Sequence, residues 1–425
     1  MDNVVLPPLA SAAVIAVGSE LLTPFRTDSN SLAITARLDE IGIRLAHKAV
    51  VGDSAQGIAS AIREAMARAD LVIISGGLGP TSDDLTREGI AEALGLALTE
   101  DAHLVEIIAA RFARRGVAMP AINRRQAMVP SGARPIENPN GSAPGLILER
   151  ADTTIVALPG PPRELLPMLE GLLAAGLGAR GAGMPLRRRV LKMTGRGESA
   201  VDEIAAPIYE PYARGPVPIE TTILASPNQV ELHLSCRWAD AAAADAVLDE
   251  ASRALEAALR PACYATDGRS LEEVVGGLLA ERGLWIATAE SCTGGLVAAR
   301  LTDVPGSSAY VRGGITAYDN RVKIDALGVD AALIDAHGAV SEPVARALAD
   351  GARSRLAADV AVAVTGIAGP GGGTPSKPVG TVVIAATGLG RARVRTVVFN
   401  GDRQLVRAQS VQAALDAVRR LVLDL

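Results

Sequence analysis

The chain has 425 residues, a length that predicts about three domains, and 49% of its residues are hydrophobic, which is enough for sizeable cores. Only 2% are aromatic and the formal net charge is -5, so the chain lacks both the stacking platform and the basic surface typical of nucleic-acid-binding proteins. The three cysteines are too few and too scattered for a disulfide framework or a metal knuckle, and no uninterrupted apolar run of about 18 residues occurs, so we expect a cytoplasmic protein with no nucleic-acid or membrane partner.

Strand and helix patterns alternate in the first part of the chain. Short apolar runs at 13–17 and 71–75 predict buried strands, and the patterns at 29–41 and 54–69 predict helices. This alternation predicts an α/β fold in which helices cover both faces of a parallel sheet. We expect this three-layer domain to span residues 10–175.

A glycine-rich segment, residues 76–84, directly follows the predicted strand at 71–75. Ligands of open parallel sheets bind at the carboxyl ends of the strands, so this segment is a candidate site for a nucleotide phosphate and a divalent cation. The candidate nucleotide-binding residues are Gly76, Gly77, Gly79, Thr81 and Ser82, and the candidate metal ligands are Asp83 and Asp84. The alternative is a plain Gly-Pro turn in which Asp83 caps the next helix.

The middle of the chain predicts a small α+β domain over residues 185–262. A loose segment of small residues at 171–185 precedes it as a linker. Strands are predicted at 189–193 and 229–235, and helices at 198–209 and 240–259. His233 falls on the polar side of the second strand, where a solvated face is the expected environment rather than a ligand or base role.

The last domain, residues 268–425, contains the stretch around which the chain is organised. A buried strand is predicted at 284–289, followed by Ser291, the turn at Gly294–Gly295 and a helix at 296–301. Ser291 is therefore expected near a helix N-terminus, where unpaired N–H groups would stabilise negative charge on a nucleophile or a substrate oxygen. The alternative is that Ser291 is only an N-cap.

Two further features of this domain support a catalytic reading. Asn320 is predicted to cap a short helix that ends at Gly328, which places Lys323 at about the third helical position. There the helix dipole and partial burial would lower the pKa of this lysine toward that of a usable base. The glycine-rich loop at 365–380 lies between two apolar strands and is expected to bind a phosphate or an oxyanion, unless it is only a mobile crossover.

A serine and a lysine near helix starts, together with a glycine-rich loop, suggest amide hydrolysis by a Ser–Lys pair. Cys292 is the rival nucleophile. A cysteine nucleophile usually needs a histidine partner, and the histidine of this domain, His337, falls in a turn with no evident relation to the site.

Four strings in this domain resemble the C-terminal domain of the CinA family, the nicotinamide-nucleotide amidase of bacteria. They are A-E-S-C-T-G-G at 289–295, G-G-I-T-A-Y-D-N-R-V-K at 313–323, H-G-A-V-S-E-P-V at 337–344, and T-G-I-A-G-P-G-G-G with K-P-V-G-T-V at 365–373 and 377–382. The strings G-S-E-L-L at 18–22, D-S-N-S at 28–31, S-G-G-L-G-P-T-S-D-D at 75–84 and L-P-G-P-P-R-E at 158–164 resemble the N-terminal CinA domain, of the molybdopterin-binding MoaB/MogA type.

The resemblance implies roles for the matching residues. Ser291 would attack the carboxamide of nicotinamide mononucleotide, with Lys323 as general base and Tyr318 assisting proton transfer, to give nicotinate mononucleotide and ammonia. The oxyanion and the ribose phosphate would be held by two loops, and their matching residues are Thr293, Gly294, Gly295, Thr365, Gly366, Gly369, Gly371 and Gly372. The amidase needs no cofactor, and the resemblance also implies a homo-oligomer, a dimer.

For the N-terminal domain, the resemblance implies metal-dependent hydrolysis of ADP-ribose at the Asp83–Asp84 segment. The sequence departs from the family pattern after Leu22, where Thr23-Pro-Phe-Arg-Thr27 stands in place of a glycine. Two other hypotheses stay open: a nucleotide- or pterin-binding protein without turnover, and an N-terminal domain that acts only as a scaffold for oligomerisation.

Overall fold

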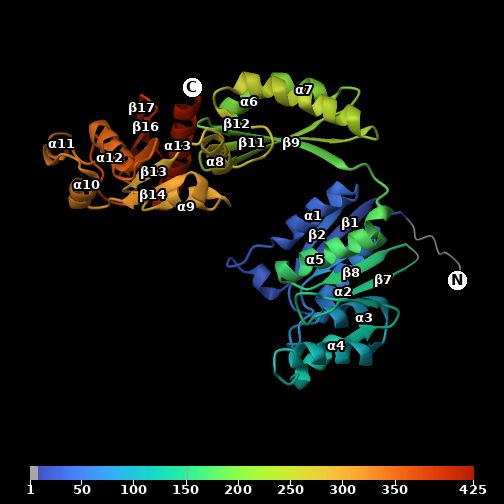
Figure 1. Ribbon diagram of the computed structural model, residues 1–425. Coiled ribbons are helices and arrows are strands. Elements are labelled where there is room, and N and C mark those ends of the chain that lie inside the picture. Colours follow the sequence, from blue (N-terminus) through green and yellow to red (C-terminus); the bar gives the residue numbers. More distant parts are fainter. Residues whose placement is uncertain (1–7, 151) are drawn as a thin grey trace. The chain divides into compact units, whose positions relative to one another are not determined.

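The computed structural model describes residues 8–150 and 152–425, which divide into two compact units (Figure 1). The first unit runs to Arg187 and includes the short segment Arg237–Ala239, and the second comprises Arg188–Cys236 and Asp240–Leu425. Among the described residues, no helix is long and apolar enough to cross a membrane.

The first unit is built on a six-stranded sheet with the order β2-β1-β3-β8-β7-β6. The first four strands in this order pair in parallel. Strand β7 pairs antiparallel with β8, and β6 pairs antiparallel with β7. The strands are β1 (Ser11–Val17), β2 (Arg44–Val51), β3 (Leu71–Ser75), β6 (Arg134–Ile136), β7 (Gly145–Glu149) and β8 (Thr154–Leu158), and a separate pair comprises β4 (Leu98–Glu100) and β5 (Met128–Pro130). Strands β1, β3 and β8 are almost entirely buried, as expected for parallel strands covered on both faces.

Helices cover both faces of this sheet. Helices α1 (Asn30–Glu40) and α5 (Pro162–Leu172) pack on one face, and α2 (Ala55–Met66), α3 (Thr86–Leu94) and α4 (Ala102–Ala113) pack on the other. The predicted α/β fold class is therefore confirmed, with an antiparallel extension of the sheet that the sequence analysis did not foresee. Strand β2 was also missed because only one face of it is shielded, so its burial alternates instead of forming an apolar run.

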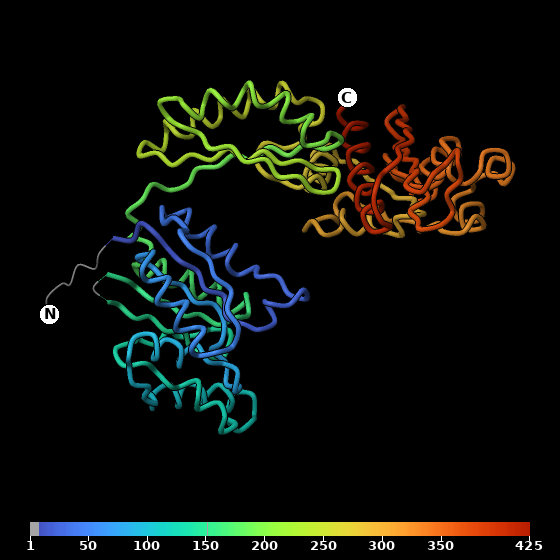
Figure 2. Tube along the Cα trace, turned by 180° about the vertical axis from the view of Figure 1, so that it is seen from behind, coloured from blue at the N-terminus to red at the C-terminus, as the bar shows by residue number. Residues whose placement is uncertain are grey.

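The second unit begins with a small antiparallel sheet of order β10-β11-β9-β12. Its strands are β9 (Leu186–Thr194), β10 (Glu220–Ser226), β11 (Gln229–Arg237) and β12 (Cys263–Ala265). Helices α6 (Glu198–Ala213) and α7 (Ala241–Leu259) cover one face of the sheet, as Figures 1 and 2 show from opposite sides. We call this part the middle domain. His233 lies on the uncovered face, partly exposed, with its Nε2 atom 2.8 Å from the Glu231 carboxylate, in agreement with the expected solvated face.

The C-terminal domain has a five-stranded sheet of order β14-β13-β15-β16-β17, in which β14, β13 and β15 are parallel. The strands are β13 (Ile286–Glu290), β14 (Val311–Thr316), β15 (Val360–Gly366), β16 (Thr381–Gly388) and β17 (Arg391–Val398). One face is covered by α8 (Leu271–Glu281), α9 (Leu296–Thr302) and α13 (Arg403–Leu423), and the other by α10 (Asn320–Leu327), α11 (Ala331–His337) and α12 (Glu342–Arg355). The carboxyl ends of three parallel strands thus meet at one edge.

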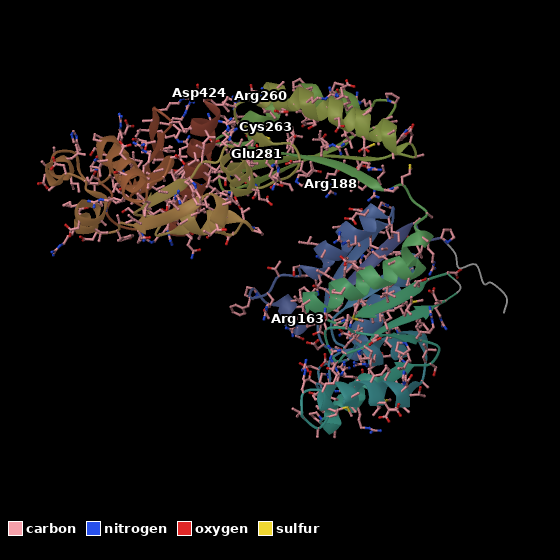
Figure 3. All side chains as sticks on the ribbon, in the orientation of Figure 1. Arg163, Arg188, Arg260, Cys263, Glu281 and Asp424 are labelled. Carbon is pink, nitrogen blue, oxygen red and sulfur yellow. The ribbon has the colours of Figure 1, made fainter. Side chains whose placement is uncertain are left out.

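Polar contacts join the middle and C-terminal domains within the second unit. The Gln229 side-chain oxygen of β11 accepts hydrogen bonds from Tyr264 Oη at 2.8 Å and from Gln412 Nε2 of α13 at 3.2 Å. Arg419 of α13 donates to the Pro261 carbonyl oxygen at 2.6 Å. Near this junction, Arg260, Cys263 and the last residues of the chain line a cavity of about 390 Å³ (Figure 3).

Candidate active site

The turn after β13 is fixed by a buried carboxylate. Glu290, the last residue of β13, is 1% exposed, and its side chain accepts hydrogen bonds from the backbone amides of Gly295 at 2.9 Å, Val297 at 3.0 Å and Ala298 at 2.9 Å. These are the amides at the start of α9, whose N-cap is Gly295. The expectation that Ser291 lies at a helix N-terminus with free N–H groups is therefore wrong, and so is the alternative that it caps the helix. Glu290, the residue before Ser291, accepts the hydrogen bonds of the amides at the start of α9.

Two amides of the turn nevertheless have no backbone acceptor among residues 8–150 and 152–425 of the chain, which leaves them available. The Gly294 amide donates to the Ser291 carbonyl oxygen at 3.1 Å, and the Gly295 amide is taken by Glu290. Within the described chain, the amides of Cys292 and Thr293 donate to no other backbone group. They directly follow Ser291, where the backbone of many acyl-transfer enzymes supplies an oxyanion hole. Of the loop residues predicted to hold the oxyanion, Thr293 fits that role through its amide, whereas Gly294 and Gly295 serve to shape the turn.

Lys323 is buried beside this turn. It is 1% exposed, and its Nζ atom donates to the Tyr318 carbonyl oxygen at 2.8 Å. The amide of Ala317, the residue before Tyr318, donates to the Glu290 carbonyl oxygen at 2.8 Å, so the carbonyl that holds Lys323 lies next to the Ser291 turn. Within residues 8–150 and 152–425, the lysine makes no hydrogen bond to Ser291 itself.

Burial lowers the pKa of Lys323 below the usual lysine value, and the nearby Asp319 carboxylate opposes that change. Asp319, not the predicted Asn320, is the N-cap of α10, and its side chain accepts from the Arg321 amide. Lys323 is consequently the fourth residue of the helix. The predicted direction of its pKa shift agrees with the structure, but the main cause is burial.

Two arginines that the sequence analysis missed connect the parts of this site. Arg403 donates to the Tyr318 hydroxyl at 2.9 Å and to the Gly369 carbonyl oxygen at 2.9 Å, and Arg407 donates to the Thr293 carbonyl oxygen at 2.9 Å. Both lie in the first turns of α13, where cations are disfavoured by the helix dipole. An arginine at the first position of a helix, as Arg403 is in α13, is a signal in the sequence of the same kind as Lys323.

The residues predicted in the glycine-rich loop separate into two groups. Thr365 is buried and donates its hydroxyl to the Ala339 carbonyl oxygen at 2.9 Å, and a Cβ at Gly366 would lie 2.8 Å from the Val382 side chain, so these two positions serve packing. Gly369 is joined to the site through Arg403, while Gly371 and Gly372 lie on the exposed part of the loop. Only the second group is placed to meet a ligand.

Cys292 has the environment of a structural thiol. Its side chain is 5% exposed, and burial raises its pKa to about 11. Roughly one thiol in a thousand would then be a thiolate at pH 8. Because the thiolate is the nucleophilic form, the environment favours Ser291 over Cys292.

The first unit holds a second candidate site. A cavity of about 380 Å³ opens at the carboxyl ends of β1, β3 and β8, and the predicted residues Gly76, Gly77, Gly79, Asp83 and Asp84 line it. Thr81 and Ser82 are exposed and do not line it. Three more carboxylates that the sequence analysis missed complete the wall, and they belong to Glu20, Asp53 and Glu164. No Lys, Arg or His is among the described residues that line this cavity.

The two predicted metal ligands differ in their surroundings. One oxygen of the Asp84 carboxylate accepts from both the amide and the hydroxyl of Thr81, at 2.8 and 2.5 Å, whereas Asp83 is exposed. Helix α3 starts only at Thr86 with Leu85 as its N-cap, so Asp83 does not cap it. The described residues contain no group of three or more His, Cys, Asp or Glu side chains arranged to hold a metal. Asp83 and Asp84 offer carboxylate oxygens, which are the donor type of Mg²⁺ sites where one or two carboxylates and substrate phosphates share the ion.

Comparison with known proteins identifies the parts of the chain. Residues 13–178 match the family model described as a probable molybdopterin binding domain, residues 188–265 match the damage-inducible protein CinA KH domain, and residues 268–422 match the CinA C-terminal domain. A CinA-like protein of Koribacter versatilis is 47% identical over 96% of this chain and 99% of its own length. The chain belongs to the CinA family.

A second relative agrees with this assignment, and two solved structures are similar to part of the chain. A putative competence-damage inducible protein of Symbiobacterium thermophilum is 45% identical over 97% of this chain and 99% of its own length. Among solved structures, a competence/damage inducible protein from Agrobacterium tumefaciens is 42% identical over 36% of this chain and 93% of that chain, with a TM-score of 0.35. A CinA protein from Thermoplasma acidophilum is 35% identical over 39% of this chain and 98% of that chain, with a TM-score of 0.37.

The burial of Cys292 leads to a prediction about its reactivity. Because its pKa is raised to about 11, the folded protein should leave Cys292 unmodified by iodoacetamide at pH 8 while the urea-unfolded protein is alkylated readily. Peptide mass spectrometry after timed quenching measures this. Equal alkylation rates in the folded and unfolded protein would contradict the account and return Cys292 to the list of nucleophiles.

Proposed function

We propose that the C-terminal domain is a nicotinamide-nucleotide amidase that hydrolyses nicotinamide mononucleotide to nicotinate mononucleotide and ammonia. The observation that carries the proposal is the buried Lys323 beside the Ser291 turn, with the two free amides of that turn. A buried lysine without a carboxylate bonded to its ammonium group is costly to keep charged, and its neutral form is a base. A protein that only binds nucleotides would need no such group at this place.

The geometry suggests how the residues divide the work. Neutral Lys323 takes the proton of the Ser291 hydroxyl as its oxygen bonds to the carboxamide carbon, and the amides of Cys292 and Thr293 stabilise the resulting oxyanion. The C–N bond then breaks, and the leaving nitrogen takes the proton to depart as ammonia. Water then attacks the ester carbonyl. Its hydroxyl joins the acyl group to give the carboxylic acid, and its other proton goes to the Ser291 oxygen as the ester bond breaks. We assign the assisting role in proton transfer to Tyr318, whose hydroxyl accepts a hydrogen bond from Arg403 and whose carbonyl oxygen accepts one from Lys323.

The substrate phosphate needs a cationic partner, and the two α13 arginines are the candidates. Arg403 is exposed and bonds both Tyr318 and Gly369 of the glycine-rich loop, while Arg407 bonds the Thr293 carbonyl oxygen of the Ser291 turn. Guanidinium groups bind phosphate oxygens in a bidentate manner. We therefore assign the phosphate to Arg403 together with the exposed residues Gly371 and Gly372, which have no side chain to keep the backbone away from it.

For the first unit we propose metal-dependent cleavage of ADP-ribose as a second activity. Its cavity is lined by five carboxylates and by no cationic side chain of the described residues, so a free pyrophosphate would be repelled there. A pyrophosphate that carries a divalent cation would not be repelled, because the cation offsets its negative charge. Asp83 and Asp84 would hold the cation, which would polarise the phosphoryl oxygens.

The first prediction for the amidase concerns the nucleophile. Ser291→Ala should abolish ammonia release from nicotinamide mononucleotide without changing the fold, because it removes one oxygen from a partly exposed turn residue. Cys292→Ser, which replaces the buried neighbour, should keep most of the activity. A coupled ammonia assay with a circular dichroism control measures both, and the opposite pattern would move the chemistry to Cys292.

The next prediction concerns the base. Since the pKa of Lys323 is lowered, the neutral fraction and hence the rate should rise with pH through a value below the usual lysine range and then level off. Lys323→Arg should be nearly as inactive as Lys323→Ala, because arginine cannot give up its proton. If the arginine variant kept a tenth or more of the turnover, a loss of no more than about 1.4 kcal/mol, Lys323 would be a positioning charge and Tyr318 the leading base.

The prediction for the first unit separates the two activities. ADP-ribose cleavage should require added Mg²⁺ or Mn²⁺ and should be lost in Asp84→Asn, while ammonia release stays unchanged because that site lies on another core. Calorimetry provides a readout besides activity: Mg²⁺ should bind weakly alone and more tightly with a non-hydrolysable ADP-ribose analogue. Absence of cleavage with several metals would favour a domain that only binds or only serves as a scaffold.

A further inference from the structure

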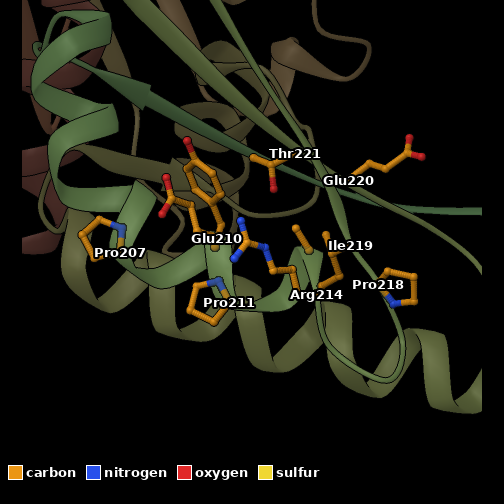
Figure 4. Close-up of a pocket in the computed structure, with 10 residues that line it drawn as sticks. Pro207, Glu210, Pro211, Arg214, Pro218, Ile219, Glu220 and Thr221 are labelled. Carbon is orange, nitrogen blue, oxygen red and sulfur yellow. The ribbon is translucent and has the colours of Figure 1, made fainter.

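Part of the wall of the first unit's cavity is bare backbone. The lining includes the four consecutive residues 76–79, three of which are glycines. The larger groove of the middle domain, of about 870 Å³, is different, because Figure 4 shows it lined by side chains such as those of Pro207, Pro211 and Arg214. A ligand in the first unit's cavity therefore meets peptide groups, and the direction of each peptide group decides what can bind there.

Thr86, the first residue of α3, holds the first two carbonyl oxygens of this segment. Its hydroxyl donates to the Gly76 carbonyl oxygen at 2.8 Å, and its amide donates to the Gly77 carbonyl oxygen at 3.1 Å. Thr86 is buried, so both bonds form away from solvent. A Cβ added at Gly77 would lie 2.3 Å from the Thr86 hydroxyl oxygen, so this close approach requires glycine.

Arg87 holds the next two carbonyl oxygens. Its guanidinium donates through Nη2 to the Leu78 carbonyl oxygen and through Nη1 to the Gly79 carbonyl oxygen at 3.3 Å. Arg87 is 2% exposed, and among the described residues no carboxylate is bonded to it. Burial lowers the pKa of Arg87 to about 10, so the side chain stays charged at neutral pH. A buried charge without a bonded counter-ion is costly, which indicates that the charge has a use beyond holding a loop.

These four bonds determine where the amides of the segment point. The C=O and N–H bonds of a trans peptide unit point in opposite directions, so a unit whose oxygen faces α3 turns its N–H away from α3. The amides turned away in this manner belong to Gly77, Leu78 and Gly79, which all line the cavity. Within the described chain these three amides donate to no other group, whereas the Gly76 amide donates to the Leu158 carbonyl oxygen at 2.9 Å. Three consecutive unpaired donors therefore lie on the cavity wall.

We propose that Thr86 and Arg87 are positioning residues of this site, which direct the three amides of residues 77–79 at the non-bridging oxygens of one phosphoryl group. The inference rests on the proposed pyrophosphate cleavage and names the groups that would hold the phosphoryl oxygens. Successive backbone amides form concavities that bind anions. They supply donors where the described lining has no cationic side chain, and the buried charge of Arg87 behind them favours the same anion.

The first arm of the test follows individual glycine amides by NMR. The full chain is labelled with ¹⁵N-glycine, and Mg²⁺ with inorganic pyrophosphate is the probe. In the wild type the signals of Gly77 and Gly79 should both shift on addition of the probe. Thr86→Val releases the Gly76 carbonyl and should remove the response of Gly77, whereas Arg87→Met releases the Leu78 carbonyl and should remove the response of Gly79. A merely structural role would change both responses together.

The second arm measures affinity by calorimetry with the same probe. The dissociation constant should rise about tenfold or more in Arg87→Met, which is the scale of one lost charge-assisted hydrogen bond. Arg87→Lys should recover only part of the affinity, because lysine keeps the charge but has one nitrogen for two carbonyls. Arg111→Met is the matched control, since Arg111 also donates to two successive carbonyl oxygens, those of Asn138 and Pro139 at 2.8 and 2.9 Å. It should leave the affinity unchanged, and circular dichroism checks the fold of each variant.

The outcomes separate the positioning role from the proposed cleavage. Equal loss of affinity in Arg87→Met and Arg111→Met would overturn the positioning role, as would glycine signals that respond together in every variant or do not respond in the wild type. If the wild type cleaves no ADP-ribose but its glycine signals respond as described, the proposed cleavage is wrong and the positioning role stands.

Discussion

The C-terminal site depends on the hydrogen bonds that the Glu290 carboxylate accepts from the first amides of α9. A buried carboxylate is stable only when its oxygens are satisfied, and three amides with the positive end of a helix satisfy them. Such charge-assisted bonds contribute about 1.5–3 kcal/mol each. They join the end of β13 to the start of α9 and hold the intervening residues 291–295 in one conformation, so Ser291 is positioned by a neighbour that itself takes no part in the chemistry.

The same interaction explains why the turn can stabilise charge without the helix dipole. Glu290 accepts the first amides of α9, so the amides of Cys292 and Thr293, which donate to no other described backbone group, are left for the oxyanion of the proposed reaction. A second buried charge, Lys323, lies beside the turn without a carboxylate bonded to its ammonium group, and its burial favours the neutral form. The site therefore combines a carboxylate that accepts three amide hydrogen bonds with a lysine that, among the described residues, is bonded to a carbonyl oxygen and to no carboxylate.

The sequence predicts the elements of this protein better than their contacts. Strand β3 and helix α2 are clear in the sequence, because a strand buried on both faces leaves an unbroken apolar run and a helix buried along one stripe leaves a period near 3.6 residues. Strands β2 and β10 escape because each lies at a sheet edge and alternates in burial. The position of Ser291 was misjudged for another reason, since serine is the commoner capping residue and a glutamate that reaches forward to amides five to eight residues away leaves no local pattern.

Site residues show the same division. Motif resemblance leads to Ser291, Lys323 and Tyr318, but Arg403 and Arg407 lie about 80 residues or more further along the chain, and only the folded sheet brings α13 to the turn. In the first unit the glycine-rich segment was evident, whereas Glu20, Asp53 and Glu164 come from three separate segments, namely the 3-10 helix Ser19–Leu22, the loop after β2 and the first turn of α5. The negative charge of these carboxylates would repel a free pyrophosphate. A pyrophosphate could therefore bind in this cavity only together with a cation.

The central claim is that Ser291 forms a covalent ester with the substrate acyl group. Rapid mixing with nicotinamide mononucleotide, acid quenching within the first turnover and peptide mass spectrometry measure this directly. The account predicts an adduct of the nicotinate mononucleotide acyl group on the peptide that contains Ser291, localised to that side chain by fragmentation. An adduct on Cys292, or ammonia release in a full first turnover with no adduct on this peptide at any quench time, would contradict it.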